Sequence, residues 1–177
     1  EWWNKKALIC EPTGKLVSAA TVSRNGSGFS THNTEFNLYA SADAWSAPVA
    51  AEVGPDGAIY IADWYNPIIQ HNVYQKREDV TRGKGNAYVS EVRDRNHGRI
   101  YRMVPKGAKP SAQPSFSNAA AALKALDHPN MLWRMHAQEL ILKQGASAIP
   151  ALKKIANGQT KGKLHAIHVL GQLGQDT

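Results

Sequence analysis

Residues 48–64 read PVAAEV-GPDG-AIYIADW, which gives two short apolar runs on either side of a tight turn. Glycine tolerates positive φ and proline presets φ at the first position of a turn, so the central four residues favour a hairpin. The run 58–64 is apolar on both faces, as in a strand whose sheet is covered on both sides. An inner strand of a β-propeller blade lies between neighbouring blades, so the pattern fits a propeller.

A second hairpin is predicted closer to the N-terminus. Residues 15–23 alternate loosely, are rich in Val, Leu and Thr, and lead into Asn25-Gly26, a pair that tolerates positive φ. Asn25-Gly26-Ser27 also matches a glycosylation sequon. The turn explains these three residues without a sugar, and we prefer that interpretation.

The last β-type run, residues 99–104, follows a long stretch without a clear pattern. This stretch lies between Trp64 and His97, and irregular segments of such length are usually functional or disordered. A functional site is therefore expected there first.

Helix formers dominate after about residue 105. Residues 106–116 are rich in Pro, Gly and Ser and predict a linker. Four short amphipathic helices are expected after it, at residues 118–126, 131–144, 148–156 and 163–173. Such paired helices favour a HEAT-type solenoid, although a small helical bundle gives a similar pattern.

The predicted fold class is therefore β followed by α. Residues 1–105 are expected to form the C-terminal part of a β-propeller, 106–116 a linker, and 117–177 HEAT-like helical repeats. The array is expected to be truncated, because the chain stops on the apolar run 169–173 without a polar cap.

Composition excludes several classes of protein. The chain has 177 residues, of which 42% are hydrophobic and 20% charged, as in a globular protein. No apolar run approaches the roughly 20 residues that span a bilayer, so no transmembrane segment is expected. The net charge of +7 raises the question of nucleic acid, but the basic residues are interleaved with acidic ones and predict a solvated surface. No nucleic-acid partner is expected.

Several motifs together resemble one family. They are residues 10–17, 53–72, 83–88 and 93–102, together with 128–134 and 164–166 in the helical part. With these motifs the chain resembles the membrane-bound dehydrogenase family of planctomycetes, verrucomicrobia and Bacteroidetes, which is related to glucose/sorbosone dehydrogenases. The likeness covers nearly the whole chain, and only its C-terminal propeller portion and first helical repeats are expected here.

The resemblance implies an exported protein, periplasmic or at the cell surface, that oxidises a carbohydrate-type hydroxyl. Related sugar dehydrogenases use pyrroloquinoline quinone with calcium, and the family often carries a c-type haem domain beyond the helical repeats. The chain has one cysteine, Cys10, and no haem-attachment motif, so that haem would lie outside it. The partners implied are a carbohydrate-type small molecule and the rest of the same protein, namely the missing blades and the cytochrome domain.

Two residues are candidates for catalysis. His71 lies in the long irregular stretch and has a side chain suited to taking a proton from a hydroxyl group. Asp63 ends a candidate inner strand, where it could hold a metal or polarise a substrate hydroxyl, or could simply accept hydrogen bonds from backbone amides. Both interpretations of Asp63 stay open, and for His71 a purely structural role is the alternative.

Further residues are candidates for binding. Trp64, Tyr65 and Asn66 follow Asp63 directly and could bind the substrate, with the aromatic rings stacking on a sugar or packing between blades. The cofactor candidates are Arg93, Arg99 and His97: the arginines could hold the carboxylates of a quinone, or could pair with nearby acidic residues. His97 could equally stabilise a turn. No metal ligand is assigned, since His165 and His168 have a zinc-like spacing but no third ligand nearby.

The leading hypothesis is an oxidoreductase fragment in which hydride passes to a quinone and electrons leave to a haem. The rival is a non-catalytic propeller and HEAT scaffold that binds extracellular glycans or a protein partner, because neither fold settles the function.

Overall fold

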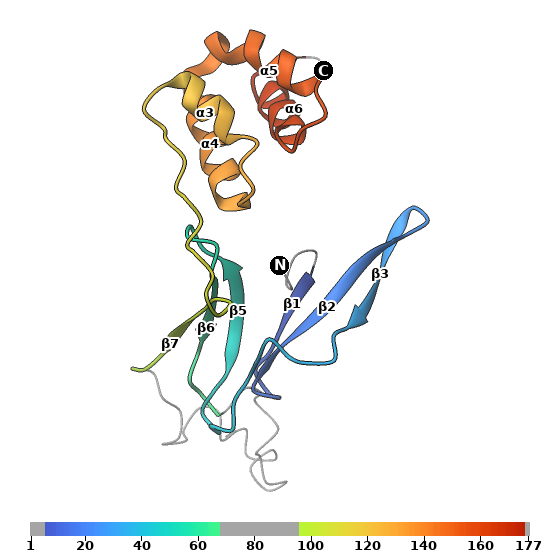
Figure 1. Cartoon of the computed structure of the whole chain (residues 1–177), viewed down its shortest axis with the longest axis vertical. Helices are drawn as coiled ribbons and strands as arrows, with labels where there is room; N and C mark the ends of the chain where they lie inside the picture. Colours follow the sequence, from blue (N-terminus) through green and yellow to red (C-terminus); the bar gives the residue numbers. More distant parts are fainter. Residues whose placement is uncertain (1–5, 68–95, 176–177) are drawn as a thin grey trace, which may run out of the picture. The chain divides into compact units, whose positions relative to one another are not determined.

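The computed structural model describes residues 6–67 and 96–175 (Figure 1). They belong to two compact units: a sheet unit (Glu1–Glu52 and Ile59–Met103) and a helical unit (Val53–Ala58 and Val104–Thr177). All described strands precede the helices along the chain, which confirms the predicted order of β followed by α.

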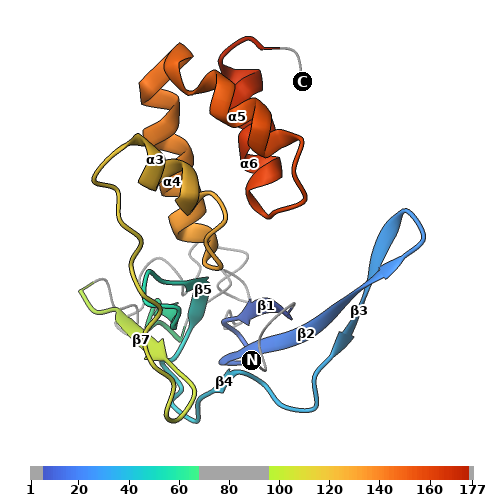
Figure 2. The same cartoon turned by 45° about the horizontal axis from the view of Figure 1, so that its top comes forward.

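The first sheet is antiparallel and built from β1 (Lys6–Glu11), β2 (Leu16–Asn25), β3 (Gly28–Asn33) and the short β4 (Tyr39–Ala40). The central strand β2 pairs with the other three, and β2 and β3 form the long hairpin in Figures 1 and 2. The predicted hairpin is confirmed, but its turn is shifted by one residue. Asn25 still pairs with Gly28, so Gly26 and Ser27 form the turn, with φ of 59° at Gly26 alone.

The second sheet has the order β5 (Pro48–Val53), β6 (Ile59–Asp63) and β7 (Arg99–Met103). The turn between β5 and β6 needs the glycine at 57, where φ is 82°. The expected cover of this strand is complete on one face and partial on the other. Ile59, Ile61 and Asp63 are buried, whereas Tyr60 and Ala62 on the opposite face are only half-buried.

The core of the sheet unit lies between its two sheets. Val17 from β2 packs with Ile59 and Ile61 from β6, and all three are at most 1% exposed. Cys10 packs against this cluster, and burial raises the pKa of its thiol. This packing holds the end of β6 beside the first sheet, which positions the site described below.

The helical unit contains α3 (Ala119–Ala125), α4 (Met131–Gln144), the single 3₁₀ turn η1 (Gly145–Ala148), α5 (Ile149–Ala156) and α6 (Gly162–Gln172). Each predicted helix is found within one residue of its predicted bounds. The side chains of Asn118 and Asn130 cap α3 and α4 at their N-termini, and Gly145 ends α4 with φ of 63°.

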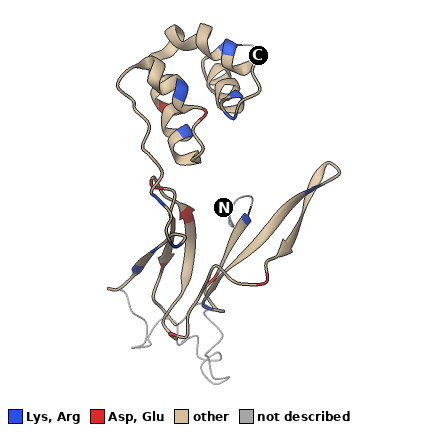
Figure 3. Ribbon diagram, viewed as in Figure 1, with Lys and Arg blue, Asp and Glu red and all other residues tan. Residues whose placement is uncertain are grey.

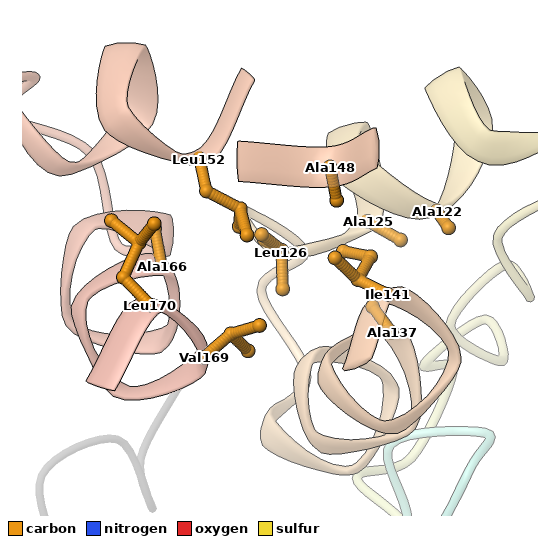
Figure 4. Packing of buried hydrophobic residues seen from close by; sticks show 10 residues of the cluster. All are labelled: Ala122, Ala125, Leu126, Ala137, Ile141, Ala148, Leu152, Ala166, Val169 and Leu170. Atoms are coloured by element: carbon orange, nitrogen blue, oxygen red, sulfur yellow. The ribbon is translucent and has the colours of Figure 1, made fainter. Parts of the chain in front are cut away.

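The helical core consists of apolar side chains from the helices and the turns that join them (Figure 4). Leu126, Ile141 and Leu152 are fully buried and meet Val169 and Leu170 of α6. Each fully buried Leu or Ile side chain contributes about 1.5–3 kcal/mol. Gly162 is buried because α6 begins against Leu126, where a β-carbon would lie 3.3 Å from the leucine backbone.

Within the described residues, no helix is both long and apolar enough to cross a membrane. Basic residues are spread over strands and helices rather than gathered on one element (Figure 3). This spread agrees with the solvated basic surface predicted from the sequence.

Candidate functional site

The candidate site is centred on the side chain of Asp63, the last residue of β6. This side chain is fully buried, with 0% of its surface exposed. Its Oδ1 accepts hydrogen bonds from the backbone amides of Ala47 (2.6 Å) and Tyr65 (2.9 Å). Its Oδ2 accepts from the Ser46 hydroxyl (3.3 Å). The carboxylate therefore ties the segment before β5 to the end of β6.

Arg99 bridges two carboxylates from the opening position of β7. The β6–β7 register places Arg99 directly opposite Asp63. Its Nε and Nη2 donate to Asp63 Oδ2 at 3.0 and 2.7 Å, and its Nη1 donates to Asp43 Oδ2 at 2.9 Å. Both donors on Asp63 meet the same oxygen, and such charge-assisted hydrogen bonds are stronger than neutral ones.

These contacts decide the charge states. Burial alone would raise the pKa of Asp63, but the amides of Ala47 and Tyr65 and the Arg99 guanidinium outweigh it and lower that pKa. The pKa of Asp43 is lowered by the Trp45 amide and by Arg99. Burial would lower the pKa of Arg99, yet its bonds to the two carboxylates raise it. All three groups are charged at neutral pH.

Aromatic rings surround the arginine. The Arg99 guanidinium carbon lies 4.0 Å from the ring centroid of Tyr65, within the range of a cation–π contact. The Tyr65 ring also lies 5.7 Å from that of Trp45. Tyr65 has φ of 56°, a left-handed backbone conformation that is uncommon for a bulky residue. We call Trp45, Tyr65 and Arg99, with the two carboxylates, the aromatic–ion cluster.

A second row of polar side chains extends the cluster. The hydroxyl of Tyr39 and that of Ser46 lie 2.9 Å apart in a hydrogen bond, and the Lys15 ammonium donates to the Ser46 carbonyl at 3.2 Å. The rings of Tyr39 and Tyr101 lie 5.1 Å apart. Burial and the hydrogen bond with Tyr39 raise the pKa of Tyr101 to about 12, so it stays a neutral phenol.

The structure brings some predicted site residues together. Asp63, Tyr65 and Arg99 belong to the aromatic–ion cluster, and Trp64 lies next to it in the chain with 41% of its surface exposed. Asn66 is fully buried and His97 is exposed. His71 and Arg93 lie outside the described residues, so their predicted roles stay predictions.

Sequence reasoning missed Asp43, Trp45 and Ser46. A signal was present, because Asp43 opens a tight turn in which its Oδ1 accepts from the Trp45 amide at 2.9 Å. That local signal predicts a turn. It cannot indicate that the same aspartate meets an arginine 56 positions further along the chain.

The cluster does not fit a quinone–calcium site. Both oxygens of Asp63 and both of Asp43 already accept hydrogen bonds from protein donors. Arg99 is matched by two carboxylates, so it offers no excess positive charge to the carboxylates of a quinone. In residues 6–67 and 96–175, no group of three or more His, Cys, Asp or Glu side chains is placed to hold a metal ion.

What the cluster offers chemically is a fixed polar wall carrying aromatic rings. The half-buried rings of Tyr65 and Trp45 lie beside the Arg99 guanidinium, and Trp64, next to Tyr65 in the chain, is exposed. Flat rings next to hydrogen-bonding groups suit ligands that combine C–H faces with hydroxyls.

The comparisons with known proteins point to one family. No curated protein and no solved structure matches the chain. Residues 1–107, which contain both sheets and the whole aromatic–ion cluster, match a family model described as "Domain of unknown function (DUF7133)". The chain therefore belongs to this DUF7133 family.

Proposed function

We propose that the two sheets are closing blades of a β-propeller, followed by the first HEAT-type repeats, within a longer exported dehydrogenase-like protein. Two antiparallel sheets in succession, which share a core through Val17, Ile59 and Ile61, support the propeller. The pairs α3–α4 and α5–α6, joined through one core, support the repeats.

We further propose that the chain contributes a wall that binds a carbohydrate-type hydroxyl compound. The strained Tyr65 is the observation that carries this proposal. A non-glycine residue in the left-handed region costs of order 1–3 kcal/mol, and such residues cluster at functional sites. Here Asp63 holds the Tyr65 amide and Arg99 covers its ring. The preceding residue, Trp64, is 41% exposed and is proposed as a second ring on which a sugar can stack.

Asp63 is a positioning residue in this proposal rather than the base. Its oxygens accept five hydrogen bonds and its pKa is lowered, so it has little tendency to take a proton from a hydroxyl group. The proton acceptor for oxidation of the substrate would be His71, outside the described residues. A quinone, if used, would be held mainly by residues other than the described ones.

The second candidate function is a non-catalytic scaffold that binds extracellular glycans. One observation favours it: every acidic side chain of the aromatic–ion cluster is already engaged in hydrogen bonds and ion pairs. Both candidates share the aromatic wall, and they differ in whether bound sugar is oxidised.

The experiment is a calorimetric titration of the full-length protein with D-glucose, D-galactose and D-mannitol. We expect binding by at least one of them, weakened at least tenfold by Tyr65→Ala and by Trp64→Ala. The matched control is Phe29→Ala, which removes an exposed aromatic ring (70% exposed) from the β2–β3 hairpin and should leave binding unchanged. Equal binding by the wild type and all three variants would refute the proposal that Tyr65 and Trp64 bind the sugar.

Turnover then separates the two candidates. With pyrroloquinoline quinone, calcium and an artificial electron acceptor, an enzyme oxidises the sugar that it binds, and His71→Ala abolishes that activity. Binding without turnover supports the scaffold.

A further inference from the structure

A buried polar clamp joins α4 to α6 in the helical unit. Arg134 of α4 donates from Nε to Nε2 of His165 on α6, at 3.2 Å. The other ring nitrogen, Nδ1, lies 3.0 Å from Oε1 of Gln138, one turn further along α4. His165 and Gln138 are each only 9% exposed. The His165–Gln138 contact is therefore buried, and the Arg134–His165 contact is partly buried.

Arg134 and Gln138 together determine which ring nitrogen of His165 carries the proton. Arginine has donors and no acceptor, so His165 Nε2 must accept and must carry no proton. The ring proton of the neutral form then lies on Nδ1 and is donated to Gln138 Oε1. His165 is thus held as the neutral Nδ1–H tautomer.

Arg134 cannot easily move away from the ring. Its Nη1 donates to the backbone carbonyls of His128 (2.6 Å) and Pro129 (2.8 Å), and its Nη2 contacts the Met131 sulfur (3.0 Å). A rotation that released His165 would break these contacts too. The guanidinium is therefore a fixed neighbour of the ring.

The charges around the clamp oppose a second positive charge. Burial, then Arg134 and then His168 lower the pKa of His165. Asp127, in the loop before α4, acts on Arg134 and does not contact the ring. On the other helices, Lys124 of α3 and Lys153 and Lys154 of α5 are exposed. Within the described residues, no acidic side chain makes a hydrogen bond or an ion pair with the imidazole.

We infer that His165 is an acid-sensitive lock between α4 and α6, closed when the ring is neutral and released when Nε2 takes up a proton. Protonation replaces the acceptor that faces Arg134 with a second donor and brings two positive charges together. The hydrogen bond is lost and the two positive groups repel each other, so the contact between α4 and α6 loosens. This device is independent of the proposed carbohydrate wall.

The direction in which stability changes with pH follows from the proton affinities of His165 in the folded and unfolded chain. The pKa of His165 is lowered in the folded chain relative to about 6.5 in the unfolded chain. The unfolded state therefore binds the proton more readily, and stability falls as the pH is lowered below about 6.5. The unfolding equilibrium constant rises by up to about tenfold per pH unit until the folded pKa is reached.

The test is urea unfolding of the full chain between pH 8 and pH 5, followed by the helical circular dichroism signal. In the described part of the chain, this signal comes from α3 to α6 and η1. We expect the acid-dependent rise for the wild type and a clearly smaller rise for His165→Gln, which keeps an oxygen acceptor for Arg134 but cannot be protonated. The matched control His168→Gln, an exposed position on the same helix, should keep most of the rise.

A second measurement keeps the inference open to refutation if His165→Gln does not fold. Nitrogen NMR of the wild-type imidazoles should show His165 as the Nδ1–H tautomer, titrating below the range of an exposed histidine. The inference would be overturned by an Nε2–H tautomer or by a titration midpoint of His165 at or above 6.5. Equal acid dependence of unfolding in the wild type and His165→Gln would also overturn it.

Discussion

Replacing Arg99 by methionine tests whether the aromatic–ion cluster is a structural clamp. The substitution keeps most of the aliphatic length and removes the guanidinium. Asp63 Oδ2 then loses two charged donors, at 3.0 and 2.7 Å, and keeps only the Ser46 hydroxyl. The two amide bonds to Oδ1 remain. A buried carboxylate is left without a counter-charge.

The expected loss is about 3 kcal/mol of unfolding free energy. Removing one partner of a buried ion pair costs about 3–5 kcal/mol. Asp63 is fully enclosed, but 32% of the Arg99 side chain is exposed, so solvent screening favours the lower end. Such a loss corresponds to roughly two orders of magnitude in the unfolding equilibrium constant.

The assay is urea unfolding of the full chain, followed by tryptophan fluorescence, because Trp45 belongs to the cluster and Trp64 adjoins it in the chain. Arg102→Met is the matched control: it removes an exposed arginine from the same strand and should cost less than about 1 kcal/mol. The double variant Asp63→Asn/Arg99→Met should recover about 1–3 kcal/mol of the combined loss, because the uncompensated charge is gone.

The pH dependence of the variant gives an independent check. In the wild type the pKa of Asp63 is lowered, so its stabilising effect is complete above the unfolded value of about 3.9 and is lost as the pH falls through the folded value. Without Arg99, burial is less opposed and that pKa rises. The stability deficit of Arg99→Met should therefore shrink towards acid pH. The structural role of the aromatic–ion cluster would be refuted by a stability deficit of Arg99→Met below about 1 kcal/mol at neutral pH. An equally large deficit of Arg102→Met would also refute it.

Two further substitutions test the helical unit. Asn130→Ala removes the cap that accepts from the Leu132 amide and the bond from Nδ2 to the Gly54 carbonyl, and should cost about 1–2 kcal/mol in urea unfolding; no measurable loss would refute this account of the cap. Gly162→Ala places a methyl group 3.3 Å from the buried backbone of Leu126 and should cost about 1–3 kcal/mol, although alanine is the better helix former. A more stable Gly162→Ala variant would show that this contact relaxes freely.

Local sequence signals predicted the helices well. The predicted range 131–144 matches the bounds of α4 in the structure, where Asn130 caps its N-terminus and Gly145 ends it. The hairpin at Asn25-Gly26 was predicted in kind but not in register. The sequence could not tell that the asparagine keeps its strand pairing and only the glycine takes positive φ.

The sequence predicts only part of the candidate site, because local signals do not show which distant residues meet. Asp63, Tyr65 and Arg99 were named because polar and aromatic residues follow a buried strand and precede another. Their partners were not, since Asp43 reaches Arg99 across 56 positions and Ser46 reaches Asp63 across 17. Contacts at such separations depend on which strands pair and how the sheets pack.

The sequence by itself determined the order of β and α elements and most of their bounds. These features depend on periodicity, turn residues and caps within a few positions of one another. Only the tertiary structure decided between the two roles left open for Asp63. Whether a carboxylate is a free base or a saturated anchor depends on the donors that packing brings to it, and here those donors come from the segment before β5 and from β7.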